Sequence, residues 1–302
     1  MNSMLRVLAL TTLLAACASA PLPPPEPAPP LQDRLEAQNR AARTAFEKGR
    51  FQQAADLYAQ ALGTATAMDD SPAIVDAHYN RAVSMMLSEN YAEARLSVAR
   101  AEGELSRSGR TQPPELTLLA ATLAYRTGED DIAWDLTASL IGAGGAGNTQ
   151  ITERTWFIRG LLAKRREDRA MLDTAITALG GSLDADTQAD RLELEGYRAA
   201  ADGNLEAAIA ALDAASLHRN EVGDYRGKSR SLVAAAEVLE VMGRKREAAN
   251  RFLRAGRSAA LRGSLGEART RLKRAEDLAI EADAPGIADE ARRQLEAIGE
   301  ES

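Results

Sequence analysis

The sequence contains few of the residues on which enzymes and metal centres depend. Its 302 residues include one cysteine, two histidines, two tryptophans, six tyrosines and four phenylalanines. A single cysteine excludes a disulfide within the chain, and His78 and His218 show neither metal-ligand spacing nor an H-E-x-x-H motif. No G-x-S-x-G nucleophile elbow occurs. We therefore expect a protein that is not an enzyme, with no metal, no cofactor and no small-molecule substrate.

Several local motifs resemble chemical sites but lack the required context. Residues 142–147 match G-x-G-x-x-G, and residues 227–229 (GKS) resemble the end of a P-loop. Both motifs need a preceding strand, whereas a helical pattern precedes each one here. Acidic pairs such as Glu193 with Glu195 are expected on solvated faces of a chain with net charge −7. We expect an inter-repeat linker at 142–147 and no nucleotide binding.

Proline is nearly absent beyond the first thirty residues. Seven of the eleven prolines lie in the segment 21–30, which should form an extended spacer of about 3.1 Å per residue. The others are Pro72, Pro113, Pro114 and Pro285, and each suits the start of a helix. Ser71 is the expected N-cap before Pro72. No segment alternates apolar and polar residues with β-branched enrichment, so we expect an all-α chain.

A short sequence motif recurs along the chain, and its copies can be aligned on one alanine. In each copy a small residue lies 12 positions before this alanine, and a glycine lies between the two. This spacing predicts a pair of antiparallel helices that cross closely at their small side chains. One copy has Asn90 near the glycine position. The aligned alanines are Ala54, Ala94, Ala133, Ala208 and Ala248, spaced by 40, 39, 75 and 40 residues. The preceding small residues are Ala42, Ala82, Ala121, Gly196 and Ala236, and the glycines are Gly49, Gly128, Gly203 and Gly243.

This pattern resembles the tetratricopeptide repeat. The resemblance implies an α-α superhelix of about six to seven helix pairs over residues 32–302. The long gap would hold an irregular unit, with Trp156 and Gly160 on its first helix and Leu172 in place of the alanine. Units near 40 residues, against the usual 34, imply longer helices or loops. A helical array of the HEAT type is the alternative.

The N-terminus predicts export. Arg6 precedes an apolar stretch of ten residues, Val7 to Ala16, which is shorter than the roughly 20 residues of a membrane span. The end of this stretch, Leu14-Ala15-Ala16-Cys17, resembles the lipobox of bacterial lipoproteins. The resemblance implies a signal peptide at 1–16, a lipid on Cys17 and a linker at 17–31. Lipoproteins that are retained in the inner membrane of Gram-negative cells often carry Asp at the position of Ala18. The resemblance therefore favours the outer membrane, on its periplasmic face. An ordinary signal peptide is the alternative.

In tetratricopeptide superhelices the first helix of each pair lines the concave face. The resemblance therefore implies partner-binding groove positions that are aromatic in five successive units, although the same rings could also pack as core. Exposed aromatic residues concentrate in protein-binding hot spots. The five candidates are Phe46, Tyr79, Tyr125, Phe157 and Tyr197.

Positive charge gathers in residues 241–274, which hold eleven Lys or Arg and two acidic residues. Arg251, Arg254, Arg257 and Arg262 are candidates for a patch that meets an anionic partner. We expect a membrane-anchored scaffold or adaptor that binds other proteins of the bacterial envelope, reaches the membrane through its lipid and does not bind nucleic acid. The alternative is a regulatory module that binds cell wall or another anionic polymer through the basic block. A third possibility is that these arginines form a solvated basic face with no partner.

Overall fold

The computed structural model describes residues 30–300, which contain 14 α-helices, one short 3₁₀ helix and no strand. The predicted signal peptide, Cys17 and the proline-rich segment up to residue 29 lie outside the described residues. No helix within 30–300 is long and apolar enough to cross a membrane. The helices are α1 (Leu31–Glu47), α2 (Phe51–Ala67), α3 (Ser71–Leu87), α4 (Tyr91–Arg107), α5 (Pro114–Arg126), α6 (Asp130–Gly142), η1 (Gly144–Gly147), α7 (Thr149–Arg165), α8 (Arg169–Leu179), α9 (Ala185–Ala201), α10 (Leu205–Glu221), α11 (Tyr225–Val241), α12 (Lys245–Leu261), α13 (Leu265–Glu281) and α14 (Pro285–Glu300).

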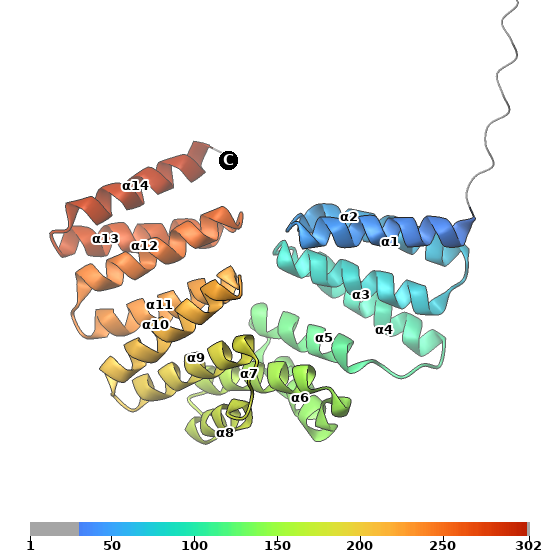
Figure 1. The fold of residues 1–302 in the computed structure, drawn as a ribbon, viewed down its shortest axis with the longest axis horizontal. Coiled ribbons are helices and arrows are strands. Elements are labelled where there is room, and N and C mark those ends of the chain that lie inside the picture. Colours follow the sequence, from blue (N-terminus) through green and yellow to red (C-terminus); the bar gives the residue numbers. More distant parts are fainter. Residues whose placement is uncertain (1–29, 301–302) are drawn as a thin grey trace, which may run out of the picture.

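Consecutive helices pack in pairs, and the pairs stack side by side into a curved solenoid (Figure 1). The curvature turns the C-terminal pairs back towards the N-terminal pairs, so that α11 and α12 face α3 across the concave side (Figure 1). Most helices are 17 residues long and are joined by short turns, which produces the 40-residue period. The all-α superhelix of helix pairs is therefore confirmed, and the long unit comes from long helices.

The predicted helix crossings contain small, buried residues. Ala42, Ala54, Ala82 and Ala94 have no exposed surface. At Gly196 of α9, a Cβ atom would lie 2.5 Å from Cγ of Leu212 on α10, closer than real Cβ contacts allow. The two helices can approach this closely because the glycine has no side chain.

The turns follow the glycine prediction with two corrections. Gly49 has φ +71°, as a left-handed helix end requires. In the second unit the left-handed residue is Glu89, with φ +64°, and not Asn90. Asn90 instead caps α4, where its side chain accepts a hydrogen bond from the Glu93 N–H at 3.4 Å. Asp70, not Ser71, caps α3 and accepts from the Ala73 N–H at 3.1 Å.

The middle of the solenoid is irregular. Helices α5 and α6 have 13 residues each and α8 has 11. A Cβ atom on Gly160 of α7 would lie 3.2 Å from the Cβ of Ala175, so Ala175 is the small partner at this crossing and Leu172 is a buried core residue. The glycines of 142–147 end α6 and form η1, and residues 227–229 lie inside α11. Neither glycine motif follows a strand.

Candidate functional site: a groove on the concave face

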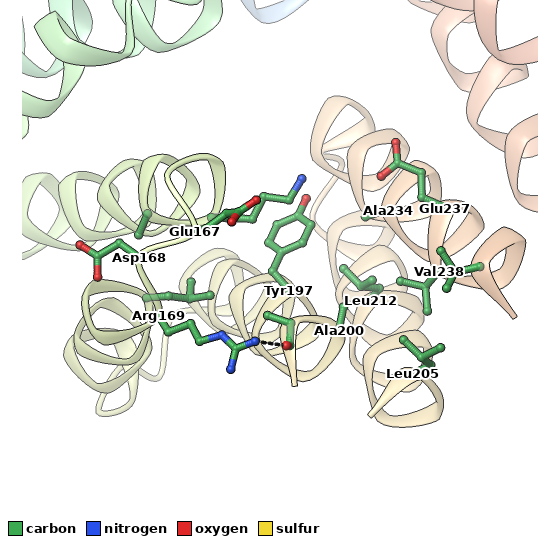
Figure 2. A pocket seen from close by; sticks show the side chains of 15 residues that line it. Glu167, Asp168, Arg169, Tyr197, Ala200, Leu205, Leu212, Ala234, Glu237 and Val238 are labelled. Carbon is green, nitrogen blue, oxygen red and sulfur yellow. Dashed lines mark hydrogen bonds between the residues drawn. The ribbon is translucent and has the colours of Figure 1, made fainter. Parts of the chain in front are cut away.

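A cavity of about 500 Å³ opens on the concave face between α7, α8, α9, α10 and α11 (Figure 2). Aliphatic side chains of Leu172, Leu205, Leu212 and Val238 form much of its lining. Small residues on α9 and α11, including Ala200, leave room between the helices. An apolar hollow with a few polar groups at its rim is typical of a site that holds part of a partner or ligand.

Tyr197 stands in the centre of this cavity (Figure 2). Its ring is half-buried, and its hydroxyl donates a hydrogen bond to Oε1 of Glu193 at 2.8 Å. Burial, reinforced by the Glu193 charge, raises the pKa of Tyr197 well above 10, so the phenol stays protonated and remains a donor. Lys164 Nζ lies 5.3 Å from the ring centroid, within the range of a cation–π contact. The ring is therefore held in a fixed position.

Two further hollows continue the cavity along the concave face. One of about 290 Å³ is lined by Tyr125, Tyr197 and Arg230, and one of about 590 Å³ reaches α13 at Glu267 and Arg271. Glu237 lines all three. These hollows together form one continuous depression across α5, α7, α9, α11 and α13, which we call the concave groove.

The charged residues at the centre of the concave groove are available to a partner. Lys164 and Glu237 are both exposed, and neither has an ion-pair partner among residues 30–300. Arg169, by contrast, is tied to the Ala201 carbonyl at the rim (Figure 2). An apolar hollow flanked by one cation and one anion, neither of which is neutralised by an ion pair among residues 30–300, can hold an extended chain and fix its direction through charge.

A buried ionic network lies beneath the concave groove. Glu193 is fully buried and accepts from Arg219 Nη2 at 2.7 Å and from Arg230 Nε at 2.5 Å. Arg219 also bonds Asp190 at 2.7 Å. Burial alone would raise the pKa of Glu193, but Arg230 and Arg219 outweigh it and lower that pKa. Burial dominates at Asp190 and raises its pKa to about 6, against the pull of Arg219 and of Arg154.

The solvated position expected for Glu193 is therefore wrong. Its arginine partners lie 26 and 37 residues away in the sequence, so the pairing of Glu193 with Glu195 did not indicate this network. The signal in the sequence was that Glu193 lies on the side of its helix that faces the core. The network matters for the site because Glu193 holds the Tyr197 hydroxyl in place.

The structure brings together only part of the predicted aromatic set. Tyr125 and Tyr197 line the concave groove. Phe157 is buried in the core below Arg219 and Arg230, so it offers no free ring to a partner. Phe46 stacks edge-on against Phe51 with ring centroids 5.4 Å apart, and Tyr79 is half-buried against the core of α3 to α5. These last three rings pack between helices.

The basic block is largely neutralised by neighbouring helices. Arg251 pairs with Asp213 at 2.6 Å, and Arg262 pairs with Glu267 at 3.1 Å. Arg254 and Arg257 have no ion-pair partner among residues 30–300. These two arginines and the paired Arg262 line a separate hollow of about 490 Å³ outside the concave groove, together with Lys228 and the exposed Leu261. The four predicted arginines thus do not form one free patch.

The described residues contain no group of three side chains arranged to hold a metal ion. The sequence matches no protein-family model and no curated protein.

Solved structures resemble the fold. A tetratricopeptide repeat protein from Parabacteroides merdae is 14% identical, with a TM-score of 0.51 over 86% of this chain and 99% of that one. A Rap protein in complex with the competence and sporulation factor is 12% identical, with a TM-score of 0.53 over 90% and 99%. The Rap conjugation gene regulator of plasmid pLS20, in complex with the Phr* peptide, is 14% identical, with a TM-score of 0.53 over 86% and 77%. The fold is therefore tetratricopeptide-like.

Proposed function

We propose that the chain is a non-catalytic scaffold that binds an extended segment of a partner protein in the concave groove. The observation that carries this proposal is the depression with an apolar floor, a fixed Tyr197 and two charges, Lys164 and Glu237, that have no ion-pair partner among residues 30–300. The neighbour from plasmid pLS20 was solved with a peptide, which supports peptide binding on this fold as the mode of action.

The partner is proposed to be another protein of the bacterial envelope. This part rests on the lipobox-like segment ending at Cys17 and on the proline-rich spacer at 21–30, which would keep the solenoid clear of a lipid surface. Two acyl chains or more are needed for lasting attachment. The mass of the mature protein should therefore show acyl groups on Cys17, and Cys17→Ser should release the protein from membranes.

Photo-crosslinking in intact cells tests the groove. A photoreactive residue at Val241, which is exposed and lines the concave groove, should capture a discrete partner. The matched control is Leu183, which is even more exposed but lies in the α8–α9 loop outside these hollows. The combination Lys164→Glu with Glu237→Lys should reduce capture at Val241, because it reverses both free charges without breaking an ion pair. Equal capture from Leu183 would contradict the proposal.

The hollow at Arg254 and Arg257 supports a second candidate function, the binding of an anionic wall polymer. These arginines and Lys228 have no carboxylate partner among residues 30–300 and share one concavity. Pelleting with purified cell wall should then weaken as salt rises and should be lost in Arg254→Gln/Arg257→Gln. Salt-independent pelleting, or pelleting unchanged by the double variant, would exclude this candidate.

A further inference from the structure

The acidic side chain of Glu89 is the centre of a contact between the two halves of the solenoid. Glu89, in the turn between α3 and α4, accepts from Arg226 Nη1 at 2.9 Å and from the Ser264 hydroxyl. Arg262 Nη1 lies 3.9 Å from the same carboxylate oxygen, and Arg226 Nη2 donates to the Leu87 carbonyl at 3.4 Å. The partners of Glu89 are 137 and 175 residues away in the sequence, so this contact spans the concave side.

Glu89 has an unfavourable backbone conformation. Its φ of +64° is the left-handed conformation that glycine takes in the equivalent turn at Gly49. A non-glycine residue there costs of order 1 kcal/mol or more. The side chain uses this position to reach Arg226 and Ser264. Burial alone would raise the pKa of Glu89, but Ser264, Arg226 and Arg262 outweigh it and lower that pKa, so the group stays charged.

Arginines are in excess around Glu89. Burial lowers the pKa of Arg126, and the nearby charges of Arg226 and Arg230 lower it further. Burial also lowers the pKa of Arg271, where Arg262 and Arg226 act in the same direction against Glu267. Arg126 donates to the Met86 carbonyl at 3.4 Å and has no ion-pair partner among residues 30–300. We call Arg126, Arg226, Arg230, Arg262 and Arg271 the arginine cluster; the carboxylates paired with its members are Glu89, Glu193 and Glu267.

The arginine cluster adjoins the concave groove. Arg230 lines the hollow that contains Tyr125 and Tyr197, and Arg271 lines the hollow that reaches α13. Two of the five guanidinium groups therefore line the groove, and in a chain of net charge −7 the five together make this junction locally positive. Guanidinium groups match carboxylates with two parallel hydrogen bonds, so this region suits an acidic segment.

We propose that the arginine cluster binds carboxylate groups of an acidic segment of the partner, and that Glu89 fills the same site when no partner is bound. The proposal rests on the groove function above and adds the charge of the partner. When an acidic segment binds, a Glu or Asp carboxylate of the partner would replace the Glu89 carboxylate at Arg226. Occupancy of the groove and closure of the solenoid are then coupled.

The test measures binding of a fluorescein-labelled peptide of alternating glutamate and leucine to the full chain, with the glutamine version as its control. The acidic peptide should bind at least about tenfold more tightly at low salt, and the difference should shrink as salt rises. Glu89→Gln should bind the acidic peptide several-fold more tightly, because the internal competitor is weakened.

Matched variants locate the site. Arg226→Gln/Arg271→Gln should lose at least about tenfold in affinity for the acidic peptide. Arg254→Gln/Arg257→Gln makes the same change in net charge outside the groove and should have little effect. If the first pair fails to keep its helicity, Arg226→Lys/Arg271→Lys replaces it and should still weaken binding, because lysine lacks the forked donors.

Three results would overturn the arginine inference: equal binding of the two peptides, equal losses from the two glutamine pairs, or complete displacement of the peptide by inorganic phosphate at low millimolar concentration. The last result would identify a phosphate site. Capture from Val241 does not depend on any of these outcomes, so the groove can stand while the arginine inference fails.

Discussion

Replacement of Gly196 tests how closely the helices of one unit approach. A Cβ atom there would meet Leu212 Cγ at 2.5 Å, Leu212 Cδ2 at 2.9 Å and the Ala208 carbonyl oxygen at 3.3 Å. Leu212 is fully buried, so a Cβ atom is admitted only if its side chain shifts towards the adjoining cavity or the two helices move apart. Alanine in a helix interior gains about 0.8–1.0 kcal/mol over glycine, whereas overpacking costs about 1–3 kcal/mol. We expect Gly196→Ala to lose about 1 kcal/mol and Gly196→Leu about 2–3 kcal/mol of unfolding free energy.

Gly103 provides the matched control. It lies inside α4, and a Cβ atom there would meet no heavy atom within 4 Å. Gly103→Ala should therefore gain up to about 1 kcal/mol from helix propensity alone. Urea and thermal unfolding followed by circular dichroism measure both changes. If Gly196→Ala stabilised the chain as much as Gly103→Ala does, the reasoning about the crossing would be wrong.

Three further predictions concern Glu89 and the buried titratable groups. Glu89→Gly should relax the left-handed turn but remove the contact with Arg226. Small-angle X-ray scattering should then show a larger radius of gyration. An unchanged radius would mean that this contact does not hold the two halves together. The pKa of Asp190 is raised to about 6 in the folded chain, so protonation of this carboxyl stabilises the fold. This contribution to the unfolding free energy is complete below pH 3.8 and is lost as pH rises through 6. Asp190→Asn should remove this pH-dependent loss, at most about 3 kcal/mol, from unfolding curves measured between pH 4 and 7. Burial, with Arg100 and Arg81 nearby, lowers the pKa of His78 to about 4, so its NMR titration should fall near that value, and a midpoint near 6.5 would contradict the burial.

The fold was accessible from the sequence because local rules set it. The alanines at 40-residue spacing mark helix crossings, and glycines such as Gly203 mark turns with positive φ. The one misplaced turn is instructive. Asn90 has the more tolerant side chain, yet Glu89 takes the left-handed position, and its contact with Arg226 depends on the curvature of the whole solenoid.

The site was only partly accessible from the sequence. The aromatic positions identified two groove residues, Tyr125 and Tyr197, because the first helix of each pair does face the concave side. Whether an arginine is free depends on acids from other helices, as Arg251 with Asp213 shows. A count of charge along the chain does not contain that information. The same holds for Glu193, whose arginine partners come from two other helices.

The central claim is that an extended partner segment lies along the concave groove. Photoreactive residues at Ala200, Val241 and Thr270 sample the groove on α9, α11 and α13, and Leu217 samples the exposed surface of α10. Mass spectrometry of the captured product gives the partner residue that each position reaches. The account predicts that the three groove positions capture one stretch of the partner, in consecutive order along its chain, and that Leu217 captures none of it. Capture of that stretch from Leu217, or capture from the groove positions without such order, would contradict the account.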